Sequence, residues 1–425
     1  MESKSINLIL FGRFPTERAY GVHAVAVADG YRRLGYKTTI FYPSTSNEKT
    51  IYEDPKEYYG NKNVNYQKIE HLDITKYFWY KILPKTIQGF LWSVTAFLWA
   101  KKIKKYIEDP YSIIWSTNPI LLYGALQDKN YVIFEMHGRA RKIQALALKL
   151  VDKKASSRSI FISSSEYGKE DLLKRKLATK IEYLHNSVDL DIFKPSIKNP
   201  YVYPEEQPFL ERIKDDAGLR AHRTNCLHIG YVGQLETYGI DKGLFLTIDA
   251  LQRALNENPH SFKSCGPIKL TIIGGPKESV EKLNRHLEEK NYQGSILLDY
   301  LGQKKQSELA SLISGFDVGI VPYPKDEHIS LYSSPMKIFE YAACGIPIIA
   351  SDIKVHKSLE YLNLGIRFYE AENIESLASL LSNFLHQQNR DGEEGLRSLS
   401  EMNISVRNGL SWEVRSKKTL DNLFN

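Results

Sequence analysis

Short apolar runs alternate with stretches of helical periodicity along both halves of the chain. In the first half the predicted strands are residues 7–11, 38–42, 113–116, 132–136, 159–163 and 181–185. In the second half they are residues 227–232, 270–273, 296–300, 318–321 and 346–350. This alternation is typical of parallel sheets whose strands are joined by crossover helices. The pattern therefore predicts an α/β fold with two Rossmann-like domains and a cleft between them.

A polar, proline-rich segment from Lys194 to about Arg223 separates the two halves. A chain of 425 residues is also too long for one ordinary core. We expect an N-terminal domain of residues 1–195, a linker or insertion of residues 196–225 and a C-terminal domain of residues 226–395. The remaining residues, 396–425, keep a helical pattern with Trp412 and Leu420 as apolar anchors.

One segment of the second half, residues 333–347, has the features of a helix whose first turn faces an anion. Ser334 is expected to be the N-cap, and Pro335 suits the first helical position because it has no N–H group to leave unpaired. The free N–H groups of Met336 and Lys337 would then point out of the positive end of the helix, where a phosphate binds well.

Glu340 lies about a turn and a half further along this helix, and helical side chains lean toward the N-terminus. Its carboxylate can therefore reach hydroxyl groups next to such a phosphate, and a phosphate beside neighbouring hydroxyls describes a nucleotide. Gly345 is expected to end the helix ahead of the buried strand at 346–350. The alternative interpretation is a well-capped helix of an ordinary α/β domain.

Other polar groups follow predicted strands, at the edge where parallel sheets bind ligands. After the strand at 227–232, Lys242 stands beside a glycine and could neutralise a phosphate, although most loop lysines are simply solvated. His137 follows the strand at 132–136 and could be either a catalytic or a structural histidine. The loop after the first strand lacks the G-x-G-x-x-G pattern, which removes the main support for an NAD-type site.

The composition is that of a soluble globular protein, with 42% hydrophobic and 25% charged residues. A net charge of +7 permits an acidic partner such as a nucleotide, an anionic lipid or a nucleic acid, but no nucleic-acid-binding module is recognisable. Cys226, Cys265 and Cys344 have no metal-binding spacing and cannot all pair, which favours a reducing compartment. Because the N-terminus has no signal-peptide pattern, we expect a cytoplasmic protein, and because the sequence shows no cluster of metal ligands, we expect it to need no metal.

Residues 74–107 contain no acidic residue, seven lysines and three of the five tryptophans. The longest uncharged run, at 86–100, is shorter than the ~20 residues that span a bilayer. Basic residues interleaved with aromatics favour a helix that lies on an anionic membrane surface. The expected membrane patch comprises Lys101, Lys102, Lys104, Lys105, Trp92 and Trp99. A buried helix with a solvated lysine end is the alternative.

Several segments, taken in order along nearly the whole chain, resemble the family-4 retaining glycosyltransferases of the GT-B fold. Ala19-Tyr20-Gly21-Val22-His23 is similar to the glycine-containing first loop of that family, and Tyr231-Val232-Gly233-Gln234 to Lys242-Gly243 is similar to its "VGR…KG" segment. His185-Asn186-Ser187-Val188-Asp189 with Phe193-Lys194-Pro195 resembles its "N-G-V-D…F-P" entry to the linker. Leu410-Ser411-Trp412-Glu413 resembles the "S-W" before a last helix that crosses back to the first domain.

The resemblance implies that the second domain binds a nucleotide-diphosphate-sugar and the first domain binds the acceptor. His137, Lys242 and Glu340 would be the catalytic residues, with His137 near the reacting sugar, Lys242 on the leaving diphosphate and Glu340 on the ribose. The implied donor-binding residues are Gly21, Gln234, Lys242, Ser333, Ser334, Pro335, Met336, Lys337 and Glu340. Arg13, His23 and Arg139 would lie in the loops of the first domain or near the acceptor.

Two positions depart from the family pattern. Tyr332 stands where the family has the first glutamate of its E-x7-E pair, which usually contacts the sugar. Gln234 stands where the family has an arginine, so that one cation is missing near the diphosphate. We expect Lys337 or Arg13 to replace that arginine.

The function expected from these features is transfer of a sugar, with retention, to a glycan or lipid-linked acceptor in cell-surface polysaccharide or glycolipid synthesis. The chemistry needs positioned amides and a lysine rather than a cofactor. A nucleotide-sugar epimerase of the same fold and a non-catalytic regulatory subunit are the alternatives. The expected partners are the donor, the acceptor and an anionic membrane surface, with the protein peripheral on the inner face of the cytoplasmic membrane.

Overall fold

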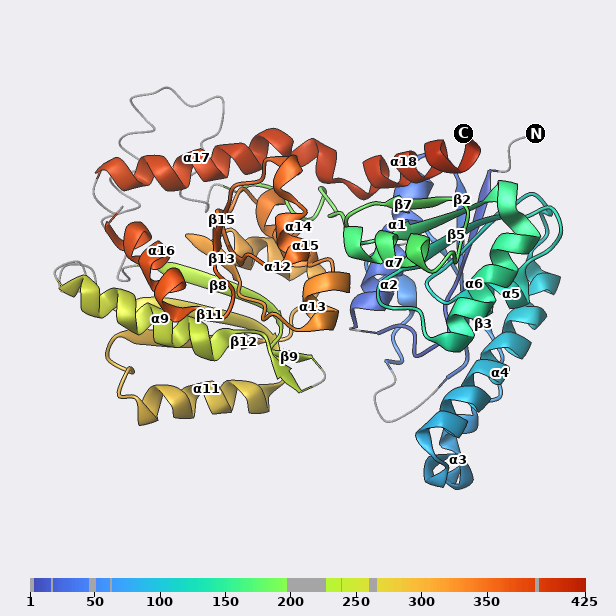
Figure 1. Ribbon diagram of the computed structural model, residues 1–425, viewed down its shortest axis with the longest axis horizontal. Coiled ribbons are helices and arrows are strands. Elements are labelled where there is room, and N and C mark those ends of the chain that lie inside the picture. The colour runs from blue at the N-terminus through green and yellow to red at the C-terminus, as the bar shows by residue number, and fades with distance from the viewer. Residues whose placement is uncertain are drawn as a thin grey trace. The chain divides into compact units, whose positions relative to one another are not determined.

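A computed structural model describes residues 4–16, 18–45, 51–61, 63–196, 227–237, 239–259, 266–386 and 390–425 (Figure 1). The chain divides into two compact units. Unit 1 comprises Met1–Asn186, Tyr332–Ser334 and Ser411–Asn425, and unit 2 comprises Ser187–Leu331 and Pro335–Leu410. The proline-rich segment expected to be a linker, together with Cys226 and Cys265, lies outside the described residues apart from its first positions.

Unit 1 is built on a parallel sheet that has seven strands among its described residues, in the order β3-β2-β1-β4-β5-β6-β7. The strands are β1 (Ser5–Ile9), β2 (Lys37–Pro43), β3 (Asn65–Ile69), β4 (Ile113–Ser116), β5 (Tyr131–Met136), β6 (Ser159–Ser163) and β7 (Ile181–Tyr183). The helices are α1 (Ala19–Arg33), α2 (Pro55–Tyr58), α3 (Phe78–Ile82), α4 (Lys85–Ile103), α5 (Pro119–Ala125), α6 (Lys142–Ala155), α7 (Glu166–Lys174) and α18 (Trp412–Phe424). Helices on the faces bury the central strands, so every residue of β4 and β6 is buried.

Unit 2 repeats this architecture with six parallel strands among its described residues, in the order β12-β11-β8-β13-β14-β15. The strands are β8 (His228–Gln234), β11 (Ile268–Gly275), β12 (Ile296–Gly302), β13 (Val318–Val321), β14 (Ile348–Ser351) and β15 (Ile366–Tyr369), with a small hairpin of β9 (Glu236–Thr237) and β10 (Ile240–Asp241). The helices are α9 (Leu244–Glu257), α11 (Lys277–Glu289), α12 (Gln306–Ile313), α13 (Glu327–Tyr332), α14 (Met336–Ala343), α15 (Lys354–Lys357), α16 (Ile374–His386) and α17 (Arg390–Val406). The prediction of two Rossmann-like α/β domains is therefore confirmed.

The last helix, α18, belongs to unit 1 although 224 intervening residues of the chain, 187–410, are almost all in unit 2. It packs against α1, where the ring of Trp412 meets the ring of His23 edge-on at 5.0 Å between centroids. Ser411 caps the helix, because its hydroxyl accepts a hydrogen bond from the N–H of Val414 at 3.2 Å. The expected C-terminal helix that returns to the first domain is thus confirmed.

Within the described part of the chain, no helix is long and apolar enough to cross a membrane.

The buried side chain of Asn403 joins helix α17 to the sheet of unit 2 by hydrogen bonds. Its Oδ1 accepts a hydrogen bond from the N–H of Gly365 at 2.7 Å, and its Nδ2 donates to the carbonyl of Ile346 at 2.8 Å. Both partners lie at the entries to β14 and β15. One side chain therefore satisfies a donor and an acceptor that would otherwise be buried and unpaired.

We expect Asn403→Ala to lower the free energy of unfolding by about 2–4 kcal/mol, because it strands a buried N–H and a buried C=O. Urea unfolding followed by circular dichroism measures the change. The control is Asn256→Ala, since Asn256 is exposed and its side chain accepts a hydrogen bond from the amide of partly exposed Gln252 at 2.9 Å. A change in Asn403→Ala no larger than in the control would contradict this account of how α17 is held.

Candidate functional site

The topology of unit 2 predicts where a ligand binds. From β8 the chain moves to β11 and β12 on one side of the sheet, and it then returns to β13 on the other side of β8. Ligands of open α/β sheets bind beyond the carboxyl ends of the strands at such a reversal. Lys242, in the loop after β10, and Tyr323, just after β13, lie at this point, as the contact between their side chains shows.

Lys242 is buried, with 7% of its surface exposed, and its Nζ lies 4.3 Å from the centroid of the Tyr323 ring. Burial lowers the pKa of Lys242 to about 8, against the opposing pull of Asp326 and Asp241. Within the described residues no carboxylate forms an ion pair with this ammonium group. It is a largely desolvated cation held by an aromatic face, which favours a bound anion.

The position of Lys242 depends on the glycine that follows it. Gly243 has a φ of +88°, and a Cβ there would lie 1.9 Å from the carbonyl oxygen of Pro322. Asp241 closes the turn, because its carboxylate accepts a hydrogen bond from the N–H of Gly243 at 2.7 Å. The lysine loop therefore touches the chain directly after β13, and only glycine permits this approach.

Glu340 lies on α14 and is also buried, with only 3% of its side chain exposed. Lys337, one turn earlier, donates from Nζ to Oε2 of Glu340 at 2.6 Å. Burial together with the nearby charge of Glu340 raises the pKa of Tyr323 to about 12. Tyr323 is thus a neighbour of both Lys242 and Glu340, so the structure brings these predicted donor-site residues together.

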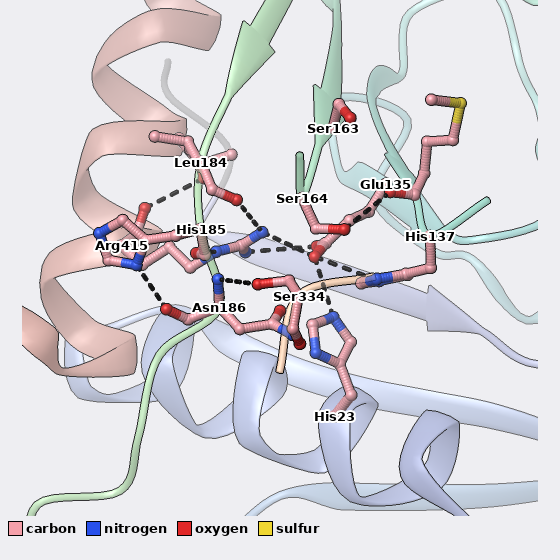
Figure 2. Close-up of polar contacts among 12 residues, drawn as sticks. His23, Glu135, His137, Ser163, Ser164, Leu184, His185, Asn186, Ser334 and Arg415 are labelled. Atoms are coloured by element: carbon pink, nitrogen blue, oxygen red, sulfur yellow. Dashed lines mark hydrogen bonds and ion pairs between the residues drawn. The ribbon is translucent and has the colours of Figure 1, made fainter. Parts of the chain in front are cut away.

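The start of α14 differs from the prediction by one residue. Pro335 is the N-cap, with extended backbone at φ −71° and ψ 105°, and the helix begins at Met336. Ser334 is not the N-cap, because its hydroxyl accepts a hydrogen bond from the N–H of Asn186 at 3.2 Å, and its carbonyl accepts from the Asn186 amide at 2.8 Å (Figure 2). Gly345, with a φ of +72°, ends the helix as expected.

Free N–H groups remain at this helix start. Those of Met336 and Lys337 have no acceptor among the residues that the structure describes. A helix N-terminus with unpaired amides and a lysine in its first turn is suited to phosphate.

Tyr332 occupies the position expected for a glutamate, and it is buried with 3% exposure. Its ring meets that of Tyr167 edge-on, with 5.4 Å between centroids. Gln234, the second departure, is exposed at the end of β8, and its carbonyl accepts a hydrogen bond from the Tyr231 hydroxyl at 2.6 Å. Neither position supplies a charge.

A second polar cluster lies in unit 1 and centres on Glu135, at the end of β5. Its carboxylate is fully buried and receives three side chains: Nη2 of Arg415 at 2.6 Å, Nε2 of His23 at 3.0 Å and Nε2 of His137 at 3.3 Å. Figure 2 shows these side chains converging on the carboxylate from α18, from α1 and from the loop after β5. His137 is the member that reaches the surface, with a third of its side chain exposed.

This cluster comprises Glu135, Arg415, His23 and His137, and Arg415 is its central cation. Besides its two bonds to the carboxylate of Glu135, its Nε donates to the carbonyl of His185 at 2.7 Å. Burial alone would raise the pKa of Glu135, but Arg415 and the two histidines hold it well below its usual value. Burial lowers the pKa of His23 to about 4, so this imidazole is neutral near pH 7.

His23, Glu135 and His137 also form the one group of possible metal ligands found among the described residues, with ligand atoms within 4.8 Å of one another. The guanidinium of Arg415 already supplies a positive charge to the same carboxylate. A divalent cation bound to these three atoms would lie next to that charge, so the cluster fits a polar contact that positions His137 better than a metal centre.

The first-loop residues are placed differently from expectation. Gly21 lies inside the first turn of α1, not in a loop, and a Cβ there would approach Thr16 and Tyr59 to 2.5 and 2.6 Å. Its smallness therefore serves packing within unit 1. His23 is buried on the same helix, whereas Arg13 donates from Nη2 to the hydroxyl of Thr16 at 3.2 Å.

Arg139 remains 63% exposed beside Asp171. Its predicted place in a first-domain loop, after β5, agrees with the structure, and a role with the acceptor stays a prediction.

The expected membrane patch requires a correction at its tryptophans. Trp99 is buried, with its Nε1 donating to the carbonyl of Ile69 at 3.4 Å, and Trp92 is partly buried against Phe11. Both rings belong to the face of α4 that packs on unit 1. The lysines do reach the surface: Lys101, Lys102 and Lys105 are exposed, and Lys104 is partly exposed.

The structure adds residues that the sequence did not single out: Glu135, Arg415 and Tyr323. A lone carboxylate inside the apolar run at β5 was the available signal for Glu135, because an unpaired acid is rarely buried. Its partner could not be found from spacing, since Arg415 is 280 residues away.

Comparisons with known proteins give a family match for part of the chain and a fold match for the whole of it. Residues 227–387 match the sequence model of the family described as Glycosyl transferases group 1, and this stretch contains Lys242 and Glu340. No curated protein matches the chain.

The fold is that of solved GT-B structures. A glycosyltransferase from Rickettsia africae is 17% identical with a TM-score of 0.66, over 100% of this chain and 98% of the other. Anabaena HepE, solved in complex with UDP and glucose, is 12% identical with a TM-score of 0.62, over 99% of each chain. Sucrose-phosphate synthase from Thermosynechococcus elongatus is 15% identical with a TM-score of 0.64, over 98% and 97%.

We expect Arg415→Met to destabilise the protein by about 3–5 kcal/mol, because it leaves the buried carboxylate of Glu135 without its counter-charge. The double variant Arg415→Met/Glu135→Gln is expected to recover much of this loss, since it removes the buried charge. Urea unfolding of the wild type, both single variants and the double variant completes the cycle. If the loss of stability in the double variant equalled the sum of the losses in the two single variants, the two side chains would not be coupled.

We also expect the free energy of unfolding to decrease in mildly acidic solution, at pH values well above those at which carboxylates become protonated. Burial lowers the pKa of His23, His185 and His356 to about 4, whereas the same groups in the unfolded chain titrate near 6.5. Between these values the unfolded state binds more protons, so the free energy of unfolding decreases as the pH falls. Urea unfolding at pH 7, 6 and 5 should show this decrease, and His356→Gln should reduce it. Equal stability at pH 7 and 5 would overturn the expectation.

Proposed function

We propose that this protein is a retaining glycosyltransferase that moves a sugar from a nucleotide-diphosphate-sugar to a glycan or lipid-linked acceptor. The proposal includes a cytoplasmic site of action and a place in cell-surface polysaccharide or glycolipid synthesis. The observation that carries it is the coincidence of the Glycosyl transferases group 1 match with the cationic site of unit 2. That site has a desolvated lysine, Lys242, and a helix start with unpaired amides at α14.

In the proposed reaction, the bond between the anomeric carbon and the diphosphate oxygen breaks while the acceptor oxygen bonds to the same carbon. The electron pair of the broken bond goes to the diphosphate, and the acceptor proton goes to a phosphate oxygen of the leaving group. Negative charge therefore grows on the diphosphate. Lys242 and the N–H groups of Met336 and Lys337 would stabilise it in a site with little water.

Glu340 would accept hydrogen bonds from the ribose hydroxyls. This carboxylate is held by Lys337, so a nucleotide would bind to a group that is already fixed in place. Lys337 also supplies a cation close to the helix start, and we propose that it replaces the arginine missing at Gln234. With these two lysines, no metal ion is required for the leaving group.

UDP-sugars are the first donors to test. HepE is described in complex with UDP and glucose, and a trehalose-6-phosphate protein from E. coli is described with UDP-2-fluoro glucose. Tyr332 affects which donor sugar could bind, because its phenol ring occupies the position where the family pattern has a carboxylate. This substitution makes a non-catalytic subunit the alternative that the experiment must exclude.

We expect one class of nucleotide-sugar to raise the melting temperature in a panel of UDP-, GDP- and other nucleotide-sugars. Glu340→Gln should weaken binding of that donor about 10- to 100-fold, because it removes an ionised acceptor from the ribose hydroxyls. Lys242→Met should lower the transfer rate about 100-fold or more by removing a charge from the leaving group. Thermal shift and a transfer assay measure the two effects, and Glu278→Gln on the exposed surface of α11 is the control.

The outcomes separate the alternatives. Transfer of the sugar to the acceptor, with the anomeric configuration retained and no reaction when acceptor is absent, supports the proposal. Interconversion of the donor without acceptor would show an epimerase, and donor binding without either reaction would show a non-catalytic subunit. Full activity in Lys337→Ala would refute the replacement of the arginine by Lys337.

A further inference from the structure

Exposed apolar side chains are concentrated on two consecutive helices of unit 1. Nine of the 19 exposed large hydrophobic residues in the described part of the chain lie between positions 72 and 98, a stretch that contains α3 and most of α4. Phe78 is 78% exposed, Ile82 67% and Phe90 56%. Figure 1 shows α3 and the first turns of α4 extending beyond the other elements of unit 1. Single exposed apolar residues are common, but a cluster of this size marks a contact surface.

Helix α4 has two different faces. Ala96, Trp99, Ala100 and Ile103 are buried against unit 1. The exposed apolar residues Ile87, Phe90, Val94 and Leu98 follow one another at intervals of three and four, so they form a stripe along the outer face. With Phe78 and Ile82 of α3 they define what we call the α3–α4 face.

The charged residues on α3 and α4 themselves all have one sign. No acidic residue occurs between positions 74 and 107. Lys81 and Lys85 are exposed where α3 meets α4, and Lys101 continues the apolar stripe one turn beyond Leu98. A protein partner would have to cover these ammonium groups, and a second copy of the chain would bring like charges together. An anionic lipid surface instead accepts apolar side chains and lysines at once.

We propose that the α3–α4 face docks the protein on an anionic lipid bilayer. The apolar stripe enters the boundary between headgroups and acyl chains, and the lysines remain at the level of the lipid phosphates. The helix lies in the surface rather than across the bilayer, because its opposite face, with Trp99 and Ile103, is buried against the rest of unit 1. This differs from the patch expected from the sequence, since Phe78, Ile82 and Phe90 take the place of Trp92 and Trp99. The inference does not rest on the proposed function.

The test is co-sedimentation of the full-length protein with vesicles of phosphatidylglycerol and of phosphatidylcholine. We expect binding to phosphatidylglycerol that weakens with added salt, and much weaker binding to phosphatidylcholine. The apolar variant Phe78→Ser/Ile82→Ser/Phe90→Ser and the charge variant Lys81→Glu/Lys85→Glu/Lys101→Glu should each reduce the partition coefficient about tenfold or more.

Matched controls come from other surfaces of the protein. Leu173→Ser/Leu297→Ser/Tyr361→Ser alters three residues of 48–59% exposure, and Lys277→Glu/Lys290→Glu/Lys304→Glu reverses three exposed lysines. Circular dichroism confirms that every variant is folded, and both controls should bind like the wild type.

Three results would overturn the proposal. They are an absence of sedimentation by the wild type, equal losses in the control variants, and self-association through the α3–α4 face, detected as a dimer that the apolar variant abolishes. Because vesicle binding needs neither donor nor acceptor, its failure would leave the proposed transfer reaction untouched. A protein that binds vesicles but transfers no sugar would refute only the proposed function.

Discussion

The ion pair between Glu135 and Arg415 is the interaction on which unit 1 depends. A buried carboxylate is tolerable only with a counter-charge and satisfied lone pairs, and Arg415 provides both through two bonds to the same group. Because the guanidinium also bonds the carbonyl of His185, it ties the end of β5, the chain beyond β7 and α18 together. His137 receives its orientation from the same carboxylate. A surface histidine is thereby supported by three segments that are far apart in the sequence.

Unit 2 solves a different electrostatic problem, because it gathers positive charge where the sheet topology reverses. Lys242 and Lys337 both belong to this site. Of the two ammonium groups, that of Lys337 is neutralised by the carboxylate of Glu340. Lys242 instead rests on the face of Tyr323, and burial lowers the pKa of its amine. Such a group gains most from an anionic ligand. The glycine at 243 makes this possible, since a side chain there would push the loop away from β13.

The sequence predicted the central strands well because they are buried on both faces and consist of continuous apolar runs, as at β4 and β14. It missed β3 and β15, edge strands whose residues are partly exposed and whose patterns are mixed. It placed Lys242, Lys337 and Glu340 correctly after strands or on α14, since short-range spacing determines these positions. It placed the membrane-facing tryptophans wrongly because the composition of a segment does not tell which face of its helix is buried, and the resemblance put Gly21 in a loop although it lies in the first turn of α1. Arg415 was beyond reach, since its partner is defined only by the fold.

The return of α18 to unit 1 also affects the order in which the two units fold during synthesis. During synthesis, residues 1–186 leave the ribosome long before Arg415, and the whole of unit 2 is made in between. More than half of the chain is therefore synthesised between Glu135 and its counter-charge, Arg415. Until then burial of this carboxylate is opposed by its own desolvation, so the first sheet cannot close its polar core. The core clusters described for unit 2 contain none of the last fifteen residues, so unit 2 is free to fold first. The N-terminal half of this protein is therefore completed last.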